Sequence, residues 1–575
     1  MVYNNAAYSY AAAEKRRQAR RCFGSGGTQG ARKGDGALAY EKKNEYLGGA
    51  AILALAVAVT KVLGVIYKVP ILNILGDEGS THFQVTYSVY NLLLTLSTAG
   101  IPVAMSRLIS ASAALERPRQ IRRYFGVGLA SFLVVGLIGM GVMLLFPQQL
   151  ADFMGDHEIA VGIRALAPAV LFSSVISVYR GYAQGFSVMS PTAISQIMEC
   201  SCKLIFGVAV ALFLSSHGFA SSDIAAGAII GVPIGLGLTI PIMILLKRRI
   251  DSRVSFGYTE DVPESRASTM KQIFRIGIPI MLSSSILNII TLIDTKLVLA
   301  RLQSGSGFSY ETAKILMGVY AKAQTLFAVP SSFMVPVTVA LIPPIAASIA
   351  LKNFKESRAV MESGVKLVNI LALPAGVGIA VMSKPLFLSL YYNSNPNGPR
   401  LLTLLGIASF FVCMQLITNA ILQASGHERL ALISLPIGGA VKILVNWLLV
   451  GTPAVNITGA PIGTLLCYVV ITGLNMAFIR SKIPDPPRFL RLFVKPALCT
   501  LVMAVCAYAV NALVFRAVGS HLSSERFAAV CGLIAGVVVG VAVYFALIIL
   551  TRAVTREDMK FVPKGEKIAE KLRIR

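Results

Sequence analysis

Long apolar stretches recur along nearly the whole chain, and short polar segments separate them. Most stretches run to roughly twenty residues with few charges, enough for one helix to cross a hydrocarbon layer about 30 Å thick. Helices suit that environment because they satisfy their own backbone hydrogen bonds. The alternating segments of about ten residues that are typical of a membrane β-barrel are not visible. The pattern therefore predicts an all-α polytopic membrane protein.

About fourteen transmembrane helices are expected from these stretches. Their approximate limits are 47–69, 81–106, 124–146, 159–183, 192–214, 223–246, 272–300, 315–345, 358–383, 401–424, 430–450, 456–479, 490–514 and 526–550. Connections after even-numbered spans carry clusters of Arg and Lys, as at 117–123 and 247–253, whereas those after odd-numbered spans hold acids such as Asp77. Lys and Arg concentrate on the cytoplasmic side, so this alternation predicts a multi-pass protein of the cytoplasmic membrane with both termini in the cytoplasm.

A weak internal repeat divides the spans into two blocks. Gln, Ser and Lys recur at the same offsets after the fourth and tenth spans, as Gln184, Ser195 and Lys203 and then as Gln423, Ser434 and Lys442. Six helices per block predict a parallel pseudo-repeat with a substrate site between the halves. The expected division is a disordered basic cytoplasmic tail at 1–46, a six-helix bundle at 47–246, a cytoplasmic linker at 247–271, a second six-helix bundle at 272–480, two extra helices at 481–551 and a basic tail at 552–575.

Composition agrees with this picture and excludes several classes of function. The 575 residues are 55% hydrophobic and 14% charged, whereas soluble domains carry about 25% charged residues. The net charge of +26 lies in clusters between spans, which favours the positive-inside pattern over nucleic-acid binding. The eight cysteines are scattered, with no zinc or disulfide spacing. Since no catalytic or Walker motif is present, we expect no catalytic residue, metal or cofactor.

Ionisable residues inside the spans are the best pointers to function, because each costs about 3 kcal/mol near the middle of a bilayer. They are Lys61 and Lys68 in the first span, Glu199 and Lys203 in the fifth, Asp294 and Lys296 in the seventh, Lys322 in the eighth, Lys366 in the ninth and Lys442 in the eleventh. Lysine predominates. A cavity lined by lysines would suit an anionic substrate such as a phosphate or pyrophosphate and would repel drug cations.

Structural explanations compete with this interpretation at several positions. Glu199 and Lys203 lie four residues apart and could neutralise each other on one helix. Lys68, Lys322 and Lys366 lie near span ends, where a long side chain could reach the interface. Both readings remain open from the sequence.

Two other positions favour function more strongly. Lys61 lies deeper in its span and has no acid three or four residues away, which favours a place in a polar cavity. Asp294 and Lys296 point to different faces of a helix. Asp294 therefore needs a partner on another helix, a proton or a bound cation. Glu199, Asp294 and Lys296 are thus candidates for ion pairing or for coupling.

Several motifs resemble one known group of proteins. They are Lys61-Val-Leu-Gly-Val-Ile-Tyr-Lys-Val-Pro70, Leu75-Gly-Asp-Glu-Gly79, Tyr179-Arg-Gly-Tyr-Ala-Gln-Gly185, Met189-Ser-Pro-Thr-Ala-Ile-Ser-Gln196 and Thr555-Arg-Glu-Asp-Met559 with Pro563-Lys-Gly565. From about residue 44 onward the chain resembles the stage V sporulation protein B group. This group comprises polysaccharide flippases of the MATE-like (MOP) superfamily, related to the lipid II flippases of the MurJ type.

The resemblance implies a carrier that moves an undecaprenyl-pyrophosphate-linked saccharide across the membrane, with lipid II, the peptidoglycan precursor, as the leading cargo. It assigns Lys61 to the central cavity by matching Lys-Val-Leu-Gly to the Arg-Val-Leu-Gly of that group, and it places Lys68 near the next basic position. The group also carries basic residues after an Asn-Leu-Leu, whereas here Leu94 and Thr95 follow Asn91-Leu-Leu. Lys203 or Lys442 could substitute for them in binding the pyrophosphate.

Two alternative functions remain. A cation-coupled multidrug exporter of the same superfamily usually has twelve spans, and residues 490–550 supply two more. A membrane glycan polymerase or ligase would need a catalytic group in a large external loop, and the external connections here are short. The expected partners are the lipid-linked oligosaccharide, membrane lipids, and a coupling cation or the membrane potential, with no nucleic acid. A vegetative and a sporulation role both remain open.

Overall fold

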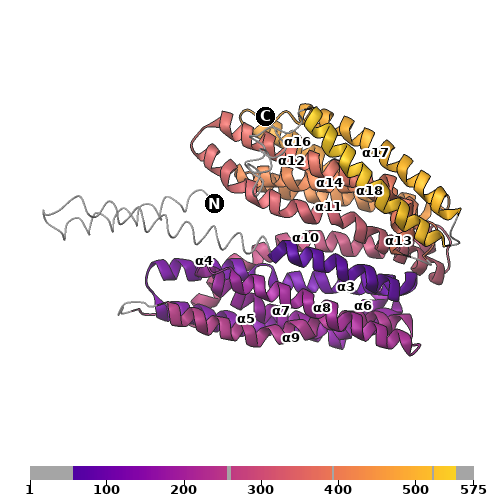
Figure 1. Ribbon diagram of the computed structural model, residues 1–575. Coiled ribbons are helices and arrows are strands. Elements are labelled where there is room, and N and C mark those ends of the chain that lie inside the picture. Colours follow the sequence, from indigo (N-terminus) through magenta and orange to yellow (C-terminus); the bar gives the residue numbers. More distant parts are fainter. Residues whose placement is uncertain (1–55, 255–260, 392–393, 521–523, 552–575) are drawn as a thin grey trace.

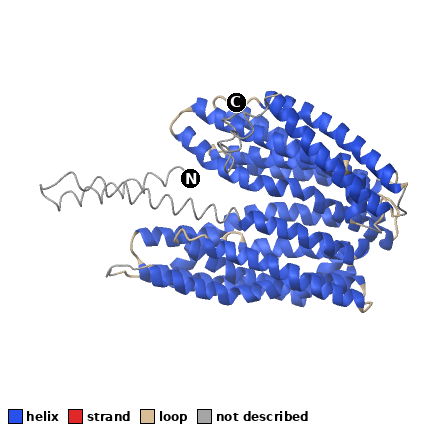
Figure 2. Cartoon of the chain, in the orientation of Figure 1, coloured by secondary structure: helices blue, strands red, loops and turns tan. Residues whose placement is uncertain are grey.

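The computed structural model describes residues 56–254, 261–391, 394–520 and 524–551, and every secondary-structure element in them is a helix (Figure 2). The expected tails at 1–46 and 552–575, and the start of the first span, lie outside the described residues. The first described helix is Ala56–Ile74. The others are α3 (Gly76–Thr98), α4 (Ile101–Ala114), α5 (Pro118–Leu145), α6 (Pro147–Met154), η1 (His157–Ile159), α7 (Ala160–Gly185), α8 (Ser190–Ser216), α9 (Ser221–Arg253), α10 (Arg266–Ser304), α11 (Tyr310–Ala350), α12 (Phe354–Val381), α13 (Ser383–Leu390), α14 (Gly398–Ala424), α15 (Glu428–Leu449), η2 (Asn456–Thr458), α16 (Gly459–Lys482), α17 (Phe489–Gly519) and α18 (Glu525–Leu550).

These helices confirm the expected membrane architecture. In the described residues, 13 helical segments are long and apolar enough to cross a membrane, with α3 and α4 forming one bent segment. The eighth expected span corresponds to α11, which is 41 residues long. Each of the fourteen expected spans therefore has its helix. The short helices α6 and α13 lie in two of the connections between spans.

Proline marks the beginning of several helices. Pro102, Pro118, Pro147, Pro191 and Pro399 each occupy the first turn of their helix. A proline there loses no hydrogen bond, since the first N–H groups of a helix have no partner within it. Local sequence thus sets many of the helix limits that hydropathy indicated only approximately.

The helices form two halves that lie side by side at one end of the molecule and diverge toward the other (Figure 1). The first half contains Ala56–Ile74 and α3 to α9, and the second contains α11 to α16. Helix α10 packs against α3, α4 and α5 and also against α15, so it contacts both halves. Helices α17 and α18 pack together, and they contact the second half through α12 and α13.

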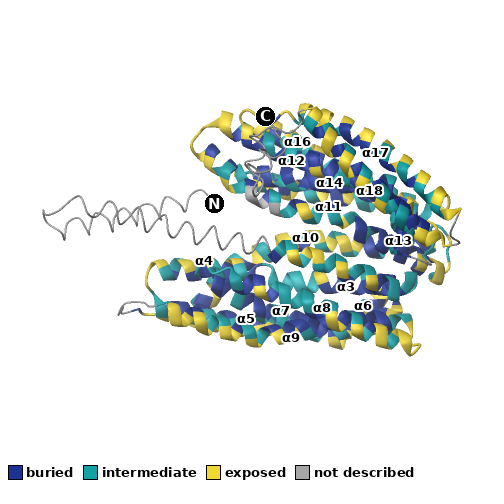
Figure 3. Ribbon diagram, viewed as in Figure 1, coloured by how far each residue is buried: buried dark blue, intermediate teal, exposed yellow. Residues whose placement is uncertain are grey.

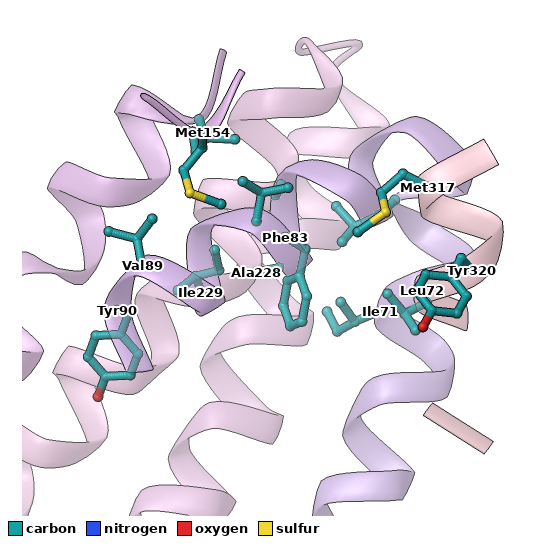
Figure 4. Close-up of a cluster of buried hydrophobic side chains, with 14 of the residues drawn as sticks. Ile71, Leu72, Phe83, Val89, Tyr90, Met154, Ala228, Ile229, Met317 and Tyr320 are labelled. Carbon is teal, nitrogen blue, oxygen red and sulfur yellow. The ribbon is translucent and has the colours of Figure 1, made fainter. Parts of the chain in front are cut away.

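Burial follows the same arrangement. At the end where the halves meet, which we call the joined end, one apolar cluster combines residues of both halves. Leu72 and Phe83 of the first half and Met317 and Tyr320 of the second belong to it (Figure 4). At the opposite end, which we call the splayed end, two separate clusters line the halves. Apolar burial therefore holds the halves together mainly at the joined end.

Many residues on the outer faces of the helices are exposed (Figure 3), and many of these are large and apolar. On α17 and α18 these include Leu498, Leu501, Val505, Ile534 and Val538, which are 58–63% exposed. A contiguous surface of this kind is unfavourable in water. It fits contact with lipid chains, as the hydropathy pattern predicts.

The connection expected at 247–271 is shorter than the sequence suggested, because α9 continues to Arg253 and α10 begins at Arg266. Its described part is attached to the start of α5. The Asp261 carboxylate accepts hydrogen bonds from the Gln120 backbone N–H at 2.8 Å and from Arg117 Nε at 3.1 Å. Asp261 thereby satisfies a free N–H at the beginning of α5, where a helix also favours a negative charge.

Candidate functional site

Lys203 lies in the interior of the first half, on α8. Its ammonium is 4.8 Å from the centre of the Tyr67 ring and 4.5 Å from that of Tyr87. Helix α9 comes very close to this part of α8, since a Cβ on Gly231 would lie 3.0 Å from the Cα of Lys203. The aromatic faces stabilise the cation without cancelling its charge. Among the ion pairs of the described residues, none includes Lys203.

Two further lysines lie near Lys203. Lys61 is exposed and Lys68 is half-buried, and they are seven residues apart on one face of the first helix. Lys68 is close enough to interact electrostatically with both Lys203 and Lys61. The structure therefore brings together three of the four lysines that the sequence singled out for the pyrophosphate. We call Lys61, Lys68 and Lys203 the basic cluster.

Glu199 does not form the expected ion pair with Lys203. Its Oε2 atom is instead 3.6 Å from Nη2 of Arg180 on α7, and Arg180 also donates from Nε to the Ser195 hydroxyl at 2.8 Å. The pairing between helices prevails because Arg180 is itself enclosed and needs a counter-charge. Glu199 still lies close enough to Lys203 to interact with its charge.

Lys442 differs from its repeat partner Lys203. Its Nζ is 2.6 Å from Oδ2 of Asp294, whose side chain is 4% exposed. Asn446, also on α15, donates to the other oxygen of Asp294. This pair joins α10 to α15 and supplies the partner on another helix that the sequence required for Asp294. Lys442 is therefore already neutralised and is separated from the basic cluster by its place in the second half.

The other flagged lysines have different surroundings. Lys296 points away from Asp294 and lies 3.6 Å from the centre of the Phe153 ring on α6. Lys366 lines a pocket at the splayed end, together with Arg488 and Lys495. That position agrees with the expectation that Lys366 lies near the end of its span.

Lys322 does not reach an interface, contrary to one of the sequence-based explanations. It is 1% exposed, and its Nζ lies 2.6 Å from Oδ1 of Asp77. Asp77 also accepts hydrogen bonds from the Ser394 hydroxyl at 2.6 Å and from the Asn395 backbone N–H at 2.9 Å. Asp77 belongs to the first half and its three partners to the second, so these contacts tie the halves together at the joined end.

Lys314 forms a second connection between the halves. The residue is fully buried, and its Nζ is 2.7 Å from Glu78 and 3.3 Å from Glu158 of the first half. The Thr81 hydroxyl also donates to the Lys314 backbone oxygen at 2.6 Å. We call Asp77, Glu78, Glu158, Lys314 and Lys322 the closing contacts.

One sequence signal could have indicated the closing contacts. Lys314 and Lys322 lie at the start of the eighth span, and the alternating topology places that start at the same side as Asp77 and Glu78. Opposite charges at one end of two packed helices are obvious candidates for pairing. The sequence could not show which carboxylate each lysine meets, because that depends on the packing of α11 against α3.

Comparison with known proteins agrees with the motifs noted in the sequence. Residues 46–348 match the family model described as polysaccharide biosynthesis protein. Three relatives come from Bacillus subtilis. The uncharacterized membrane protein YabM is 29% identical over 545 residues, 93% of this chain and 98% of the relative. The lipid II flippase MurJ is 27% identical over 462 residues, 76% of this chain and 83% of the relative. Stage V sporulation protein B is 24% identical over 529 residues, 91% of this chain and 98% of the relative.

Solved structures share the fold. A lipid II flippase MurJ in an inward closed conformation superposes with a TM-score of 0.64 at 14% identity, over 87% of this chain and 98% of that one. An inward-facing multidrug resistance MATE family transporter of the MOP superfamily gives a TM-score of 0.60 at 18% identity, over 75% of this chain and 98% of that one. These likenesses confirm the fold class expected from the sequence.

Proposed function

Because the chain belongs to the polysaccharide biosynthesis protein family, we propose that it is a flippase that moves an undecaprenyl-pyrophosphate-linked saccharide, the lipid II peptidoglycan precursor, across the cytoplasmic membrane by alternating access. The observation that carries this proposal is the basic cluster. Lys203 lies inside a membrane-spanning bundle with aromatic faces as its neighbours. Uncompensated positive charges inside a membrane-spanning bundle are costly, and an anionic ligand would lower that cost.

A pyrophosphate fits the cluster for an electrostatic reason. Removing either a lysine ammonium or a pyrophosphate from water is costly, and each partner lowers the cost for the other when they meet. Lys61, the exposed member, is suited to the first encounter, whereas Lys203 lies deeper between two tyrosines. The substrate would thus move from Lys61 and Lys68 toward Lys203 as its head group leaves the cytoplasm.

The proposed orientation puts the splayed end in the cytoplasm and the joined end outside. The splayed end carries the basic segments, including Arg119, Arg122, Arg123 and Arg266, which line one pocket. Lys and Arg favour the cytoplasmic side. In this orientation the structure represents a state that is closed to the outside, and the closing contacts must break before cargo can leave.

A multidrug exporter of the same superfamily is the alternative, and the charges argue against it. A site for drug cations needs available carboxylates. Glu199 and Asp294 are the acids that the sequence placed within spans, and both are paired with cations, Arg180 and Lys442 respectively. The free charges near the centre of the first half are positive, which disfavours a cationic cargo.

The test uses cells depleted of their own lipid II flippases. The wild-type chain is expected to restore growth and to restore lipid II that an external reagent can reach. Lys61→Ala should lose this activity, whereas Lys61→Arg should keep part of it because charge matters more than shape for a mobile head group. Lys384→Ala, an exposed lysine on α13, serves as the control and should behave as wild type. External lipid II at the normal level with Lys61→Ala, at normal expression, would remove Lys61 from the site, and no rescue by the wild-type chain would exclude lipid II as cargo.

A further inference from the structure

A buried histidine at the joined end lies among carboxylates of its own half. His82 on α3 is 1% exposed. Its Nδ1 atom is 2.8 Å from Oδ2 of Asp156, and its Nε2 atom is 3.0 Å from Glu158 and 3.9 Å from Glu78. Although Glu158 is near, Nε2 makes no hydrogen bond of acceptable geometry. The imidazole therefore presents an unpartnered ring nitrogen toward two carboxylates.

A cation from the other half already occupies the neighbourhood of these carboxylates. The Lys314 ammonium lies 2.7 Å from Glu78 and 3.3 Å from Glu158, and 3.1 Å from Glu311 of its own helix. The side chains of Glu78 and Glu158 are 38% and 43% exposed, so solvent reaches them from the joined end. Without Lys314, the carboxylates of Glu78 and Glu158 would have no lysine or arginine paired with them in the described residues.

We propose that Glu78, His82 and Glu158 form a binding site for a divalent transition-metal ion, with zinc as the best match, and that Lys314 competes with the metal for it. One ligand atom from each of the three lies within 4.8 Å of the others. An imidazole nitrogen with two carboxylate oxygens is a ligand set that suits Zn²⁺ and leaves a position for water.

Asp156 supports this assignment from the far side of the ring. Its carboxylate holds Nδ1 of His82 at 2.8 Å and also accepts from the Tyr310 hydroxyl at 2.9 Å. A carboxylate that binds one ring nitrogen fixes the tautomer in which the other nitrogen is free to bind a metal. Asp156 is fully buried, so its orientation is well determined by packing.

The competition links the metal to the closing contacts. Lys314 belongs to the second half and the three ligands to the first, so separation of the halves at the joined end would withdraw the ammonium and free the site. Bound zinc would then favour the separated state and slow the cycle. This consequence rests on the proposed alternating access, whereas zinc binding itself does not.

The experiment measures Zn²⁺ binding to the purified full chain in lipid nanodiscs, by competition with a fluorescent zinc indicator. Lys314→Gln removes the competing charge and is expected to lower the Kd for Zn²⁺ by about tenfold or more. Adding His82→Gln to Lys314→Gln should abolish that gain. His157→Gln is the matched control, because His157 is an exposed histidine at the same end that pairs with Asp152 and lies outside the site.

The proposal is overturned if Lys314→Gln binds Zn²⁺ no more tightly than the wild type, or if His82→Gln leaves the gain intact. Glu158→Gln in the Lys314→Gln background replaces His82→Gln if the latter is not monodisperse, and it should also lose the gain. A gain seen equally with Mg²⁺ would show a general cation site and contradict the ligand set. Because binding needs no cargo, a failed growth rescue with intact zinc binding would refute the proposed function alone.

Discussion

At the scale of single residues, the two repeat-related lysines show how one position can serve different purposes. Lys203 faces aromatic rings, whereas Lys442 is paired with Asp294. The difference arises because the seventh span carries Asp294 within ion-pairing distance of Lys442. In the described residues, no carboxylate forms an ion pair with Lys203. The charge in the first half is thus without a carboxylate partner in that part of the chain that the structure describes, whereas the charge in the second half joins α10 to α15.

The Asp294–Lys442 pair gives a prediction about stability. Lys442→Met leaves the Asp294 carboxylate buried without its cation, which typically costs about 3–5 kcal/mol. Adding Asp294→Asn should recover most of the loss, because the remaining amide is neutral and Asn446 is still beside it. The measurement is the midpoint of thermal unfolding in detergent. Lys296→Met, two residues from Asp294, is the control and should shift the midpoint little. Equal loss in the single and double variants would show that the pair contributes no specific stability.

At the scale of helices, the joined end depends on a close approach of α11 to the start of α3. A Cβ placed on Gly318 would overlap the backbone oxygen of Asp77, and it would lie 3.1 Å from the Thr81 hydroxyl oxygen. Backbone atoms cannot move aside as the tip of a flexible side chain can. The absence of a side chain at Gly318 therefore lets Lys314 and Lys322, which flank it on α11, reach the carboxylates of the first half.

Gly318→Ala is expected to separate α11 from α3 and to weaken the closing contacts. Thr81, fully buried at this contact, can report the change after replacement by cysteine. In the Thr81→Cys background, Gly318→Ala should raise the rate of labelling by a membrane-impermeant maleimide several-fold. Gly378→Ala is the matched control on α12, since a Cβ there would meet no atom within 4 Å. Unchanged labelling with Gly318→Ala would mean that the helices can shift without opening this end.

At the scale of the whole molecule, the joined and splayed ends predict a topology that can be measured. Cysteines introduced at the exposed positions Gln149 and Asn397 of the joined end should react with an impermeant reagent added to intact cells. Cysteines at Arg253 and Asp485 of the splayed end should react only after the membrane is opened. The physical reason is the preference of Lys and Arg for the cytoplasmic side. The reverse pattern would invert the proposed direction of transport.

Hydropathy and charge by themselves determined the helical class and the spans, and short motifs such as Tyr179–Gly185 carried the family resemblance. These features follow from short stretches of chain, since a run of apolar residues favours a membrane helix whatever its neighbours are. Lys61, Lys68, Lys203 and Lys442 were also singled out from the sequence, because an uncompensated charge in an apolar span is costly wherever the span lies.

Only the tertiary structure decided which charges are neutralised. Lys322 and Asp77 are 245 residues apart, and Lys314 and Glu78 are 236 apart. Pairs so distant in the chain form only when helices pack in one particular order and depth, and no local pattern encodes that. The same reason explains why Glu199 pairs with Arg180 on another helix although Lys203 lies one turn away. The strength of an ion pair depends on distance and on exclusion of water, and packing sets both.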